Sequence, residues 1–376
     1  SLVLNGTTGI SGTNALTGVT SVNSGQVSGR RNIVINGEMK VAQRSASVAG
    51  LGAAAGYFTL DRWKMPVGAT SAGRFTMAQV ADGPAGIANC LKLTTTTADT
   101  SIAAGEALLL QTNFEGQDLQ QLKKGTASAE QVTVSFYVKG NAAALYVCEL
   151  FDQDNTRSIT QSFAVTTAWN RIELTFAADT SDPLDDDTAN SFSLQIWLHA
   201  GATYTGGTFA VNTWNDSTNA NRYAVADRTS IFDATSRTFF ITGVQMEIGT
   251  QATDFESRSF GEELALCERY FTKSFAYEIA PAQNGGALNV ITGQGQAASS
   301  PAYAYVYFKQ TMRATPTIVT FNPSAANANW RNTASGGALT VAVSFTGDSG
   351  TFIGSNTEVL GQYHLCAIHY TASAEL

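Results

Sequence analysis

A long polar stretch between residues 201 and 228 holds the side chains whose types and spacing best suggest a binding site. It spreads Tyr204, Trp214 and Tyr223 among amides and carboxylates that include Asn215 and Asp216. An aromatic face can bind the C–H surface of a sugar, while amides and carboxylates bind its hydroxyl groups. We therefore predict that these five residues form a glycan-binding site. For Trp214 a second interpretation stays open, namely burial against a sheet or against a neighbouring subunit.

Trp330 and Arg331 suggest a second, smaller site of the same kind. They lie among asparagines and small residues in the stretch NANWRNTASGG, residues 327–337. These neighbours predict that the indole is exposed instead of packed in a core. We predict that Trp330 and Arg331 contribute to glycan binding in the C-terminal part of the chain.

Four aspartates are concentrated within the acidic stretch SDPLDDDTAN, residues 181–190. Like charges this close repel one another unless a cation or solvent lies between them. Calcium takes several oxygen ligands from such loops, so we predict Asp182, Asp185 and Asp187 as ligands of a structural calcium ion. The spacing differs from that of an EF-hand, and a solvated turn is the alternative. No other cofactor is predicted.

The sequence contains no H-E-x-x-H, G-x-S-x-G or P-loop motif. His364 and His369 would point to opposite faces of one strand and could not share a metal ion. His199 stands alone and is interpreted as a hydrogen-bonded structural residue. Asp152 and Asp154 could form the carboxylate pair of a glycosidase, but any acidic loop contains such pairs. We therefore expect no enzyme activity.

The bulk composition excludes two classes of partner. A formal net charge of −8 argues against nucleic-acid binding, which requires a basic surface. The chain has no apolar run of about 18 residues, so membrane insertion is not expected, and its first residues lack the features of a signal peptide. Charged residues make up only 14%, with 34 glycines, which suits short strands joined by tight turns. The four cysteines lack a C-x-x-C pattern and are interpreted as buried free thiols.

Strands must position most of these residues. The alternation of apolar and polar side chains in residues 132–139 is the clearest strand signal. Further strands are predicted at residues 91–93, 108–111, 144–151, 158–165, 171–176, 192–199 and 239–248, and then at 303–308, 316–321, 339–345 and 365–371. About eight strands in two sheets is the count of a jelly roll. The C-terminal strands suffice for a small β-sandwich.

Residues 239–271 join the two β segments. The first part alternates, which places one set of side chains on a single strand face: Phe240, Thr242, Val244, Met246 and Ile248. Gln245 and Glu247 are predicted on the opposite face. Ser259 and Glu262 then form a predicted capping box. It starts a helix with one apolar stripe of Phe260, Leu264, Cys267 and Phe271.

Three stretches of this sequence resemble one family of bacteriophage proteins. GVQMEIGTQATDFE and GEELALCERYF lie within residues 239–271, RRNIVINGEMKVAQR covers residues 30–44, and TLDRW covers residues 59–63. In their order along the chain, residues 30–44, then 59–63, then 239–271, they resemble a domain of phage tail-fibre and other virion appendage proteins. The resemblance implies a jelly roll similar to carbohydrate-binding modules. FKQTMRATPTIVTFNP and HYTASAEL further resemble the terminal tip domain of phage fibres.

We therefore predict an all-β protein with four parts: an N-terminal stalk at residues 1–29, a jelly roll at 30–256, a connecting helix at 257–272 and a C-terminal β-sandwich tip at 273–376. The uncharged stalk cannot bury enough apolar surface alone, so it is either disordered or packed against sister chains. The resemblance implies a homotrimer. Its predicted contacts are Leu2, Leu4, Ile10, Leu16 and Val19.

The predicted function is that of a fibre subunit of a phage virion, an extracellular particle made in the host cytoplasm. It would attach to the host surface, through a glycan or a protein, and three linked copies would provide avidity. Its N-terminal side would meet other virion proteins. The main alternative is a structural capsid decoration or tail connector that binds other virion proteins. A third hypothesis is a surface-polysaccharide depolymerase, which predicts a cleft with paired carboxylates.

Overall fold

The computed structural model describes residues 21–22, 25–26, 30–69, 71–294, 301–355 and 364–376 of the chain. Strands dominate these residues, and the α-helices among them are the short α1 (Ala202–Thr205) and α2 (Phe260–Glu268). The all-β prediction is therefore confirmed. None of the described helices is long and apolar enough to cross a membrane. The predicted trimer contacts at residues 2–19 lie outside the described residues, which begin at β1 (Ser21–Val22) and β2 (Gly25–Gln26).

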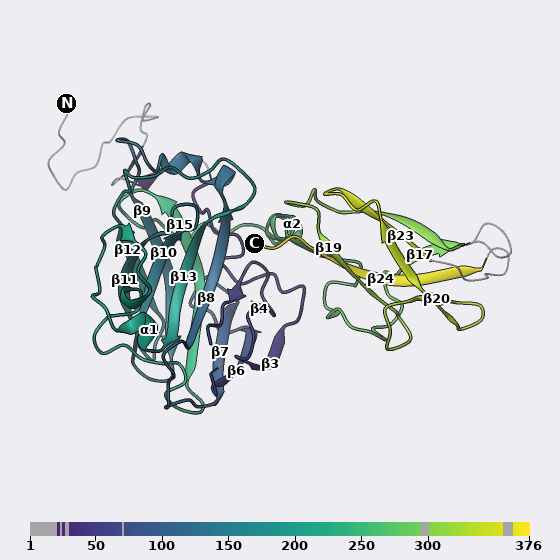
Figure 1. Cartoon of the computed structure of the whole chain (residues 1–376), viewed down its shortest axis with the longest axis horizontal. Helices are drawn as coiled ribbons and strands as arrows, with labels where there is room; N and C mark the ends of the chain where they lie inside the picture. The colour runs from purple at the N-terminus through teal and green to yellow at the C-terminus, as the bar shows by residue number, and fades with distance from the viewer. Residues whose placement is uncertain (1–20, 23–24, 27–29, 70, 295–300, 356–363) are drawn as a thin grey trace, which may run out of the picture.

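The larger part of the chain is a sandwich of two antiparallel sheets (Figure 1). The seven-stranded sheet has the order β14–β11–β10–β13–β8–β5–β4, and the six-stranded sheet has the order β12–β9–β15–β7–β6–β3. The strands are β3 (Ser47–Leu51), β4 (Gly56–Tyr57), β5 (Lys64–Met65), β6 (Arg74–Val80), β7 (Cys90–Thr97), β8 (Ala107–Glu115), β9 (Val132–Gly140), β10 (Ala144–Asp152), β11 (Arg157–Val165), β12 (Asn170–Phe176), β13 (Asn190–Ala200), β14 (Asn215–Asp216) and β15 (Thr238–Ile248). Every strand predicted in this part is present.

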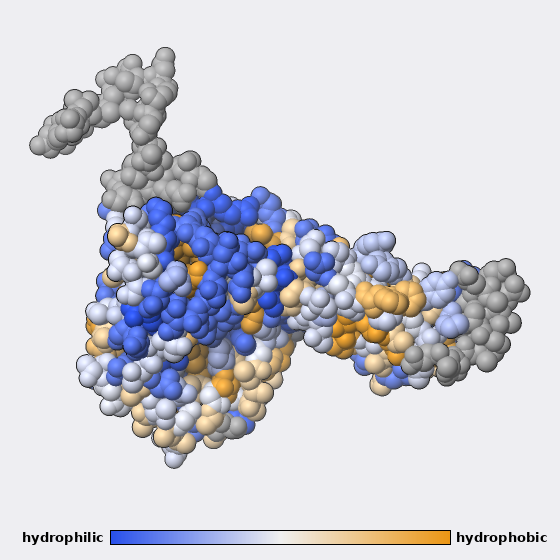
Figure 2. Space-filling model, turned by 45° about the horizontal axis from the view of Figure 1, so that its top comes forward, coloured by the Kyte–Doolittle hydropathy of each residue, from blue (hydrophilic) through white to orange (hydrophobic). Residues whose placement is uncertain are grey.

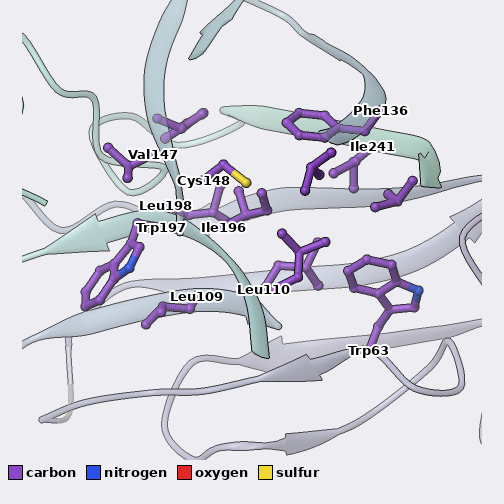
Figure 3. Packing of buried hydrophobic residues seen from close by; sticks show 14 of the residues in the cluster. Trp63, Leu109, Leu110, Phe136, Val147, Cys148, Ile196, Trp197, Leu198 and Ile241 are labelled. Carbon is purple, nitrogen blue, oxygen red and sulfur yellow. The ribbon is translucent and has the colours of Figure 1, made fainter. Parts of the chain in front are cut away.

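Side chains from both sheets meet in one hydrophobic core (Figure 3). Phe136 of β9 meets Phe163 of β11 edge-to-face, with ring centroids 5.0 Å apart. Tyr146 of β10 meets Phe239 of β15 in the same way at 5.5 Å. Alternation along the strands sends these side chains inward, and burying each one stabilises the fold by roughly 1.5–3 kcal/mol.

A β-bulge in β15 corrects the predicted strand face. Thr242 pairs with Tyr137 of β9, whereas Gln245 pairs with Ser135, so β15 contains one extra residue. Gly243 lies in this bulge with φ of 60°, a conformation that glycine adopts without steric cost. The extra residue reverses the alternation. The core side chains are therefore Phe239 and Ile241 before the bulge and Val244 and Met246 after it.

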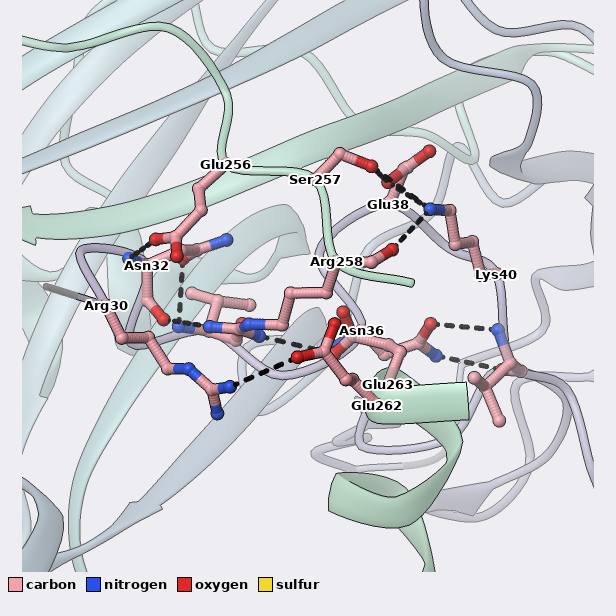
Figure 4. A network of polar contacts seen from close by, with 12 residues as sticks. Arg30, Asn32, Asn36, Glu38, Lys40, Glu256, Ser257, Arg258, Glu262 and Glu263 are labelled. Atoms are coloured by element: carbon pink, nitrogen blue, oxygen red, sulfur yellow. Dashed lines mark hydrogen bonds and ion pairs between the residues drawn. The ribbon is translucent and has the colours of Figure 1, made fainter. Parts of the chain in front are cut away.

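The stretches that carry the family resemblance meet in a buried polar network (Figure 4). Glu256 accepts the backbone N–H groups of Arg31 and Asn32, each at 2.7 Å. Glu263 of α2 accepts the N–H of Asn36 at 2.5 Å, and Arg258 binds Glu263 at 3.3 Å. Arg258 and Glu263 are both buried and pair with each other, as the burial of charged groups requires. The motif residues therefore join the two ends of the jelly roll and form part of its scaffold.

Helix α2 begins as predicted. Ser259 Oγ accepts the N–H of Glu262 at 3.3 Å, and the Glu262 carboxylate accepts the N–H of Ser259 at 3.1 Å, which completes the capping box. The predicted apolar stripe is correct only in part. Cys267 is buried, but Phe260 is 45% exposed and contacts Tyr277 at the helix surface. The charged Glu263 takes part in the buried face because Arg258 neutralises it.

The C-terminal part has a separate, smaller hydrophobic cluster. β24 is its central strand and pairs with four others, in a sheet that also contains β21. A second sheet has the order β18–β23–β22. The strands are β16 (Phe271–Lys273), β17 (Ile291–Gln294), β18 (Tyr303–Tyr307), β19 (Thr317–Phe321), β20 (Trp330–Asn332), β21 (Ala338–Leu339), β22 (Val341–Ser344), β23 (Gly350–Ser355) and β24 (Leu365–Ser373). Strand β16 starts inside the predicted helical segment 257–272, because α2 ends at Glu268.

The last residues connect this part to the jelly roll. The Glu375 carboxylate accepts hydrogen bonds from Arg44 at 3.0 Å and from Arg62. The carbonyl of Leu376 accepts the Tyr57 hydroxyl at 2.6 Å and the Asn113 amide at 2.9 Å. In Figure 1 the C-terminus accordingly lies between the two parts, near α2. These contacts hold the C-terminal part against the edge of the seven-stranded sheet.

Candidate functional site

The predicted glycan loop folds back over the face of the seven-stranded sheet that points away from the sandwich interior. Its backbone is held at both ends: Thr203 donates to Ala104, in the turn before β8, at 2.9 Å, and Thr229 donates to Leu145 of β10 at 3.0 Å. Between them, β14 pairs with β11 as the edge strand. As a result, every residue of β8 and all but the first of β13 are buried. The loop therefore covers a sheet face that would otherwise be exposed.

A buried carboxylate on that face explains why the loop folds inward. Glu149 of β10 has no exposed surface and accepts the indole N–H of Trp197 at 2.6 Å. Arg222 of the loop binds both Glu149 oxygens at 2.9 Å, and its guanidinium lies over the Trp197 ring at 4.9 Å. An unpaired carboxylate here would be strongly destabilising. Arg222 thus neutralises Glu149 and anchors the loop.

Tyr223 belongs to this packing, so its predicted role as an exposed sugar platform is wrong. It is buried and stacks on Trp197, with ring centroids 6.0 Å apart, while its hydroxyl donates to the carbonyl of Thr229 at 2.7 Å. Burial raises the pKa of Tyr223. Tyr204 is half-buried and contacts the same indole at 5.2 Å. Both tyrosines extend the core instead of facing a ligand.

Trp214 keeps part of its ring accessible. Its indole N–H donates to the carbonyl of Ala177 at 2.8 Å, and one side of the ring packs on Phe192 at 6.2 Å. The Lys124 ammonium lies 5.6 Å from the ring centroid. The residue is half-buried, which combines the two interpretations that the sequence left open. A ring fixed in this way needs little further ordering to bind a flat ligand.

Strand β14, which directly follows Trp214, borders a small polar hollow; the Trp214 ring itself lines a separate hollow with Ala177 and Phe192. Asn215 and Asp216 line the polar hollow, and the Asp216 side chain is 95% exposed and pairs with Arg157 at 3.1 Å. The other lining residues are Ser158, Thr160, Ala210, Thr218, Asn221 and Arg222. Its volume is about 10 Å³, the size of a single water site. Hydroxyl, amide, carboxylate and guanidinium groups converge there, and this is the donor and acceptor set that binds sugar hydroxyls.

Basic side chains, distant in the sequence, neutralise the aspartates beside the hollow. Lys124 binds Asp152 at 2.5 Å and Asp179 at 3.1 Å, and Arg157 lies 3.9 Å from Asp182. Burial alone would raise the pKa of Asp179, but hydrogen bonds from Arg157, Ser181 and Lys124 outweigh it and lower the pKa.

The predicted calcium ligands do not converge. Among the described residues, no group of three or more His, Cys, Asp or Glu could hold a metal ion. The Asp187 carboxylate accepts the nearby N–H of Ala189 at 2.8 Å, and Asp185 donates its own N–H to Asp154 at 2.9 Å. Calcium binding by Asp182, Asp185 and Asp187 therefore stays a prediction without a preformed site.

The prediction that Trp330 is exposed is wrong. Trp330 is buried in the second hydrophobic cluster, where its indole N–H donates to the carbonyl of Gly354 at 3.1 Å. In β20, which pairs with β21 and β24, Arg331 points to the opposite face, while Asn332 lies on the face of Trp330 and is also buried. Arg331 is half-buried and donates to the carbonyl of Gly336 at 2.9 Å. The structure thus assigns Trp330 to the core of the C-terminal part.

The most exposed aromatic residues lie elsewhere, on the sheet β18–β23–β22. Tyr303, Tyr305 and Tyr307 alternate along β18 on one face, and Phe352 of β23 shares that face because it pairs with Tyr305. Phe345 follows β22 and contacts the Phe352 ring at 6.1 Å. We call these five residues the aromatic face. The sequence signal was the repeated tyrosine at alternate positions in YAYVY, which we interpreted only as a strand.

His199, Ser230 and Glu106 form a hydrogen-bonded chain. The two nitrogens of the His199 ring lie 2.7 Å from Ser230 Oγ and 3.1 Å from the Glu106 carboxylate. Burial lowers the pKa of His199, although Glu106 opposes the shift. The Phe232 ring covers the imidazole, and Ser230 Oγ also accepts the Phe232 N–H at 3.0 Å. These contacts hold the end of the loop on β13, as expected of a structural histidine.

Comparisons with known proteins are limited. No protein-family model and no curated protein match the chain. Similar solved structures include the family 11 carbohydrate-binding module of cellulosomal cellulase Lic26A-Cel5E from Clostridium thermocellum, with 14% identity and a TM-score of 0.27 over 56% of this chain and 99% of the module. A family 30 carbohydrate-binding module has 12% identity and a TM-score of 0.29 over 61% of this chain and 94% of its own.

A third similar structure is the enzymatically active domain of tailspike protein 4 from bacteriophage CBA120. It has 12% identity and a TM-score of 0.30, and the match covers 58% of this chain but only 21% of the tailspike chain. At such low TM-scores none of these likenesses carries an argument about this protein. What is established is an all-β chain with a two-sheet sandwich and a second, smaller β part.

Proposed function

We propose that this chain is a virion fibre subunit that attaches to a host surface by binding glycans beside Trp214. The three sequence stretches that resemble phage fibre proteins support the virion setting. The proposal includes a homotrimer formed through residues 1–29, with other virion proteins on that side. Weak sites on three copies would together give useful avidity.

One observation carries the glycan assignment. Trp214 presents part of a fixed aromatic ring, and the adjacent Asn215 and Asp216 line a hollow of hydrogen-bonding groups. A sugar could stack on the ring while its hydroxyls replace water in the hollow. Tyr204 packs against Trp197 of β13 and so holds the loop on the sheet. Arg222 binds Glu149 of β10 and fixes the loop there as well. The buried residues thus keep the accessible ones in place.

The test compares Trp214→Ala with Trp169→Ala. Trp169 is a matched control, because it is also half-buried, donates its indole N–H to a carbonyl (Asp82, 3.1 Å) and has a lysine ammonium 4.9 Å from its ring. Neither indole lines the polar hollow, but Trp214 directly precedes Asn215 and Asp216, which do. We expect Trp214→Ala to weaken binding to host-surface glycans about tenfold, as expected for the loss of one stacking contact. Trp169→Ala should bind like the wild type.

Glycan arrays and binding to whole host cells give the readout. Equal losses in both variants would contradict the assignment to Trp214. If the wild-type protein does not bind host cells but binds virion particles, the result would favour the structural decoration or connector. Release of sugar from host envelopes would instead favour a depolymerase.

A further inference from the structure

The aromatic face is unusual because large rings remain exposed on an ordered sheet. Tyr303, Tyr305, Tyr307 and Phe345 are 40%, 51%, 78% and 83% exposed. Their rings also contact one another: Tyr303 stacks on Phe352 with centroids 5.7 Å apart, and Tyr305 lies 4.6 Å from Tyr307. Figure 2 shows other hydrophobic residues, in orange, gathered on the same C-terminal half. A mutually packed set of exposed rings indicates a contact surface.

The area of the face is sufficient for a protein interface. At roughly 200 Å² for each aromatic side chain, the four exposed fractions amount to about 500 Å² on one copy. Two such faces in contact would bury about 1,000 Å², before any neighbouring residue is counted. This reaches the lower limit for a specific interface between proteins.

Charge favours a second copy of this chain as the occupant. The chain carries a formal net charge of −8, so two copies repel each other over most of their surfaces. Strands β18, β22 and β23 contain no charged residue. A neutral, aromatic face is therefore where two acidic copies can meet at the least electrostatic cost. Enrichment in tyrosine and phenylalanine with depletion of charge is also the composition of interface centres.

The same composition argues against a sugar on this face. A sugar site needs amide, carboxylate or guanidinium groups around the rings. Here the polar groups on the face are phenol hydroxyls and Ser344, which pairs with Phe352. None of the three tyrosine hydroxyls of β18 has a hydrogen-bond partner within the described part of the chain. The hollow beside Trp214, in contrast, has the full set.

We propose that the aromatic face packs against the aromatic face of a second copy, so that copies associate through their C-terminal parts. Side chains from the two sheets would interleave as in a β-sandwich, at the usual separation of about 10 Å. This contact is independent of residues 1–29 and of the glycan site. A face that packs against itself joins copies two at a time, so the contact would link copies of different trimers through their C-terminal parts.

The first experiment measures association of the full chain by sedimentation velocity. The test variant is Tyr305→Ser combined with Phe345→Ser, and the control is Leu288→Ser, which removes an exposed apolar side chain outside the aromatic face. We expect the double variant to raise the dissociation constant of the copies at least about tenfold, because each lost ring removes buried apolar area. The control should associate like the wild type, and thermal unfolding checks that all three proteins are folded.

The second experiment places single cysteines at positions 303, 305 and 307. The four natural cysteines are buried and free, so an introduced surface thiol is the reactive one. At least one of the three variants should form disulfide-linked pairs under mild oxidation, and Leu288→Cys should not.

Three outcomes would overturn the proposal. One is a wild-type chain that stays monomeric at about 100 µM, far above the dissociation constant expected for such an interface. In another, the serine variant associates as tightly as the wild type and the cysteine variants form no disulfide-linked pairs. This result would assign assembly to residues 1–29. The third is a monomeric wild type whose glycan binding is lost in the serine variants, which would make the face a sugar site.

Discussion

The outer faces of two sheets in this protein carry aromatic residues and differ in what covers them. In the jelly roll, Trp197 points outward from β13, and Tyr204, Tyr223 and Arg222 of the chain's own loop cover it. In the C-terminal part, the tyrosines of β18 point outward from their sheet, and no described residue covers them. The first face contains a buried carboxylate, Glu149, that only an internal cation could neutralise. The second is uncharged and free to meet another molecule.

This difference shows that an aromatic residue on an outward strand position has no single meaning. The chain either supplies its own cover, and the aromatic residue becomes core, or it leaves the ring available for a partner. The polar partners decide between the two. The indole N–H of Trp197 and the Glu149 carboxylate are both engaged within the chain, whereas the phenols of β18 have no hydrogen-bond partner among the described residues. Function should therefore be sought on the open face and beside the half-covered Trp214.

The largest expected effect comes from substituting one aromatic residue on each face. Trp197→Ala should lower the free energy of unfolding by about 4 kcal/mol, because it leaves a large cavity and removes a hydrogen bond from Glu149. Tyr307→Ala should change it by less than about 0.5 kcal/mol, since the side chain is mostly exposed. Urea unfolding measures the free energy of unfolding of both variants, at a protein concentration low enough for the copies to be dissociated. Similar losses in the two variants would show that the faces are equally covered.

A smaller effect is expected from removing one arginine in each part. Arg222→Met leaves the Glu149 carboxylate buried without its cation and should cost about 3 kcal/mol. Arg331→Met removes a hydrogen bond to the carbonyl of Gly336 at a half-buried position and should cost about 1 kcal/mol. The double variant Glu149→Gln with Arg222→Met should recover part of the loss. If Arg222→Met lowers the free energy of unfolding by no more than Arg331→Met does, the anchoring role of Arg222 is contradicted.

The smallest effect concerns the pH dependence of the jelly-roll part. The folded state holds the pKa of Asp179 below its ordinary value, because hydrogen bonds from Arg157, Ser181 and Lys124 outweigh the effect of burial. The unfolded chain therefore takes up this proton at a higher pH than the folded chain does. The stabilisation is present above a pH of about 4 and is lost as the pH falls through the folded pKa.

The measurement is the melting temperature between neutral pH and about pH 3. Asp179→Asn should be less stable than the wild type at neutral pH, and the difference should shrink in acid. Asp227→Asn, at an exposed loop position, serves as the control and should follow the wild-type profile. An Asp179→Asn profile parallel to that of the wild type would contradict the assignment.

Local patterns predicted the elements well. Strands β9, β10 and β11 lie within one residue of their predicted bounds. Both hydrogen bonds of the predicted capping box at Ser259 are also present. These features depend on neighbours along the chain. The face of β15 was predicted only in part, because one residue at Gly243 reverses the alternation without changing the apolar pattern. A bulge is set by pairing with β9, which the pattern of a single strand does not contain.

The candidate site was predicted less well than the fold. Asn215 and Asp216 line a polar hollow and Trp214 directly precedes them, whereas Tyr223 and Trp330 are buried. A polar sequence environment suggested exposure in all of these cases. It misled for Trp330 because neighbours in a strand point to alternate faces, so a buried ring can lie between two half-buried polar side chains, here Asn329 and Arg331.

The amino-acid sequence by itself determined where strands, turns and the α2 helix form, since these follow from side-chain periodicity and capping within a few residues. It also determined the formal net charge of −8. Only the tertiary structure decided which outward faces stay open. Arg222 reaches Glu149 across 73 residues, and Lys124 reaches Asp179 across 55 residues. Burial of a charge depends on the partner that arrives in space, and separation in sequence does not reveal that partner.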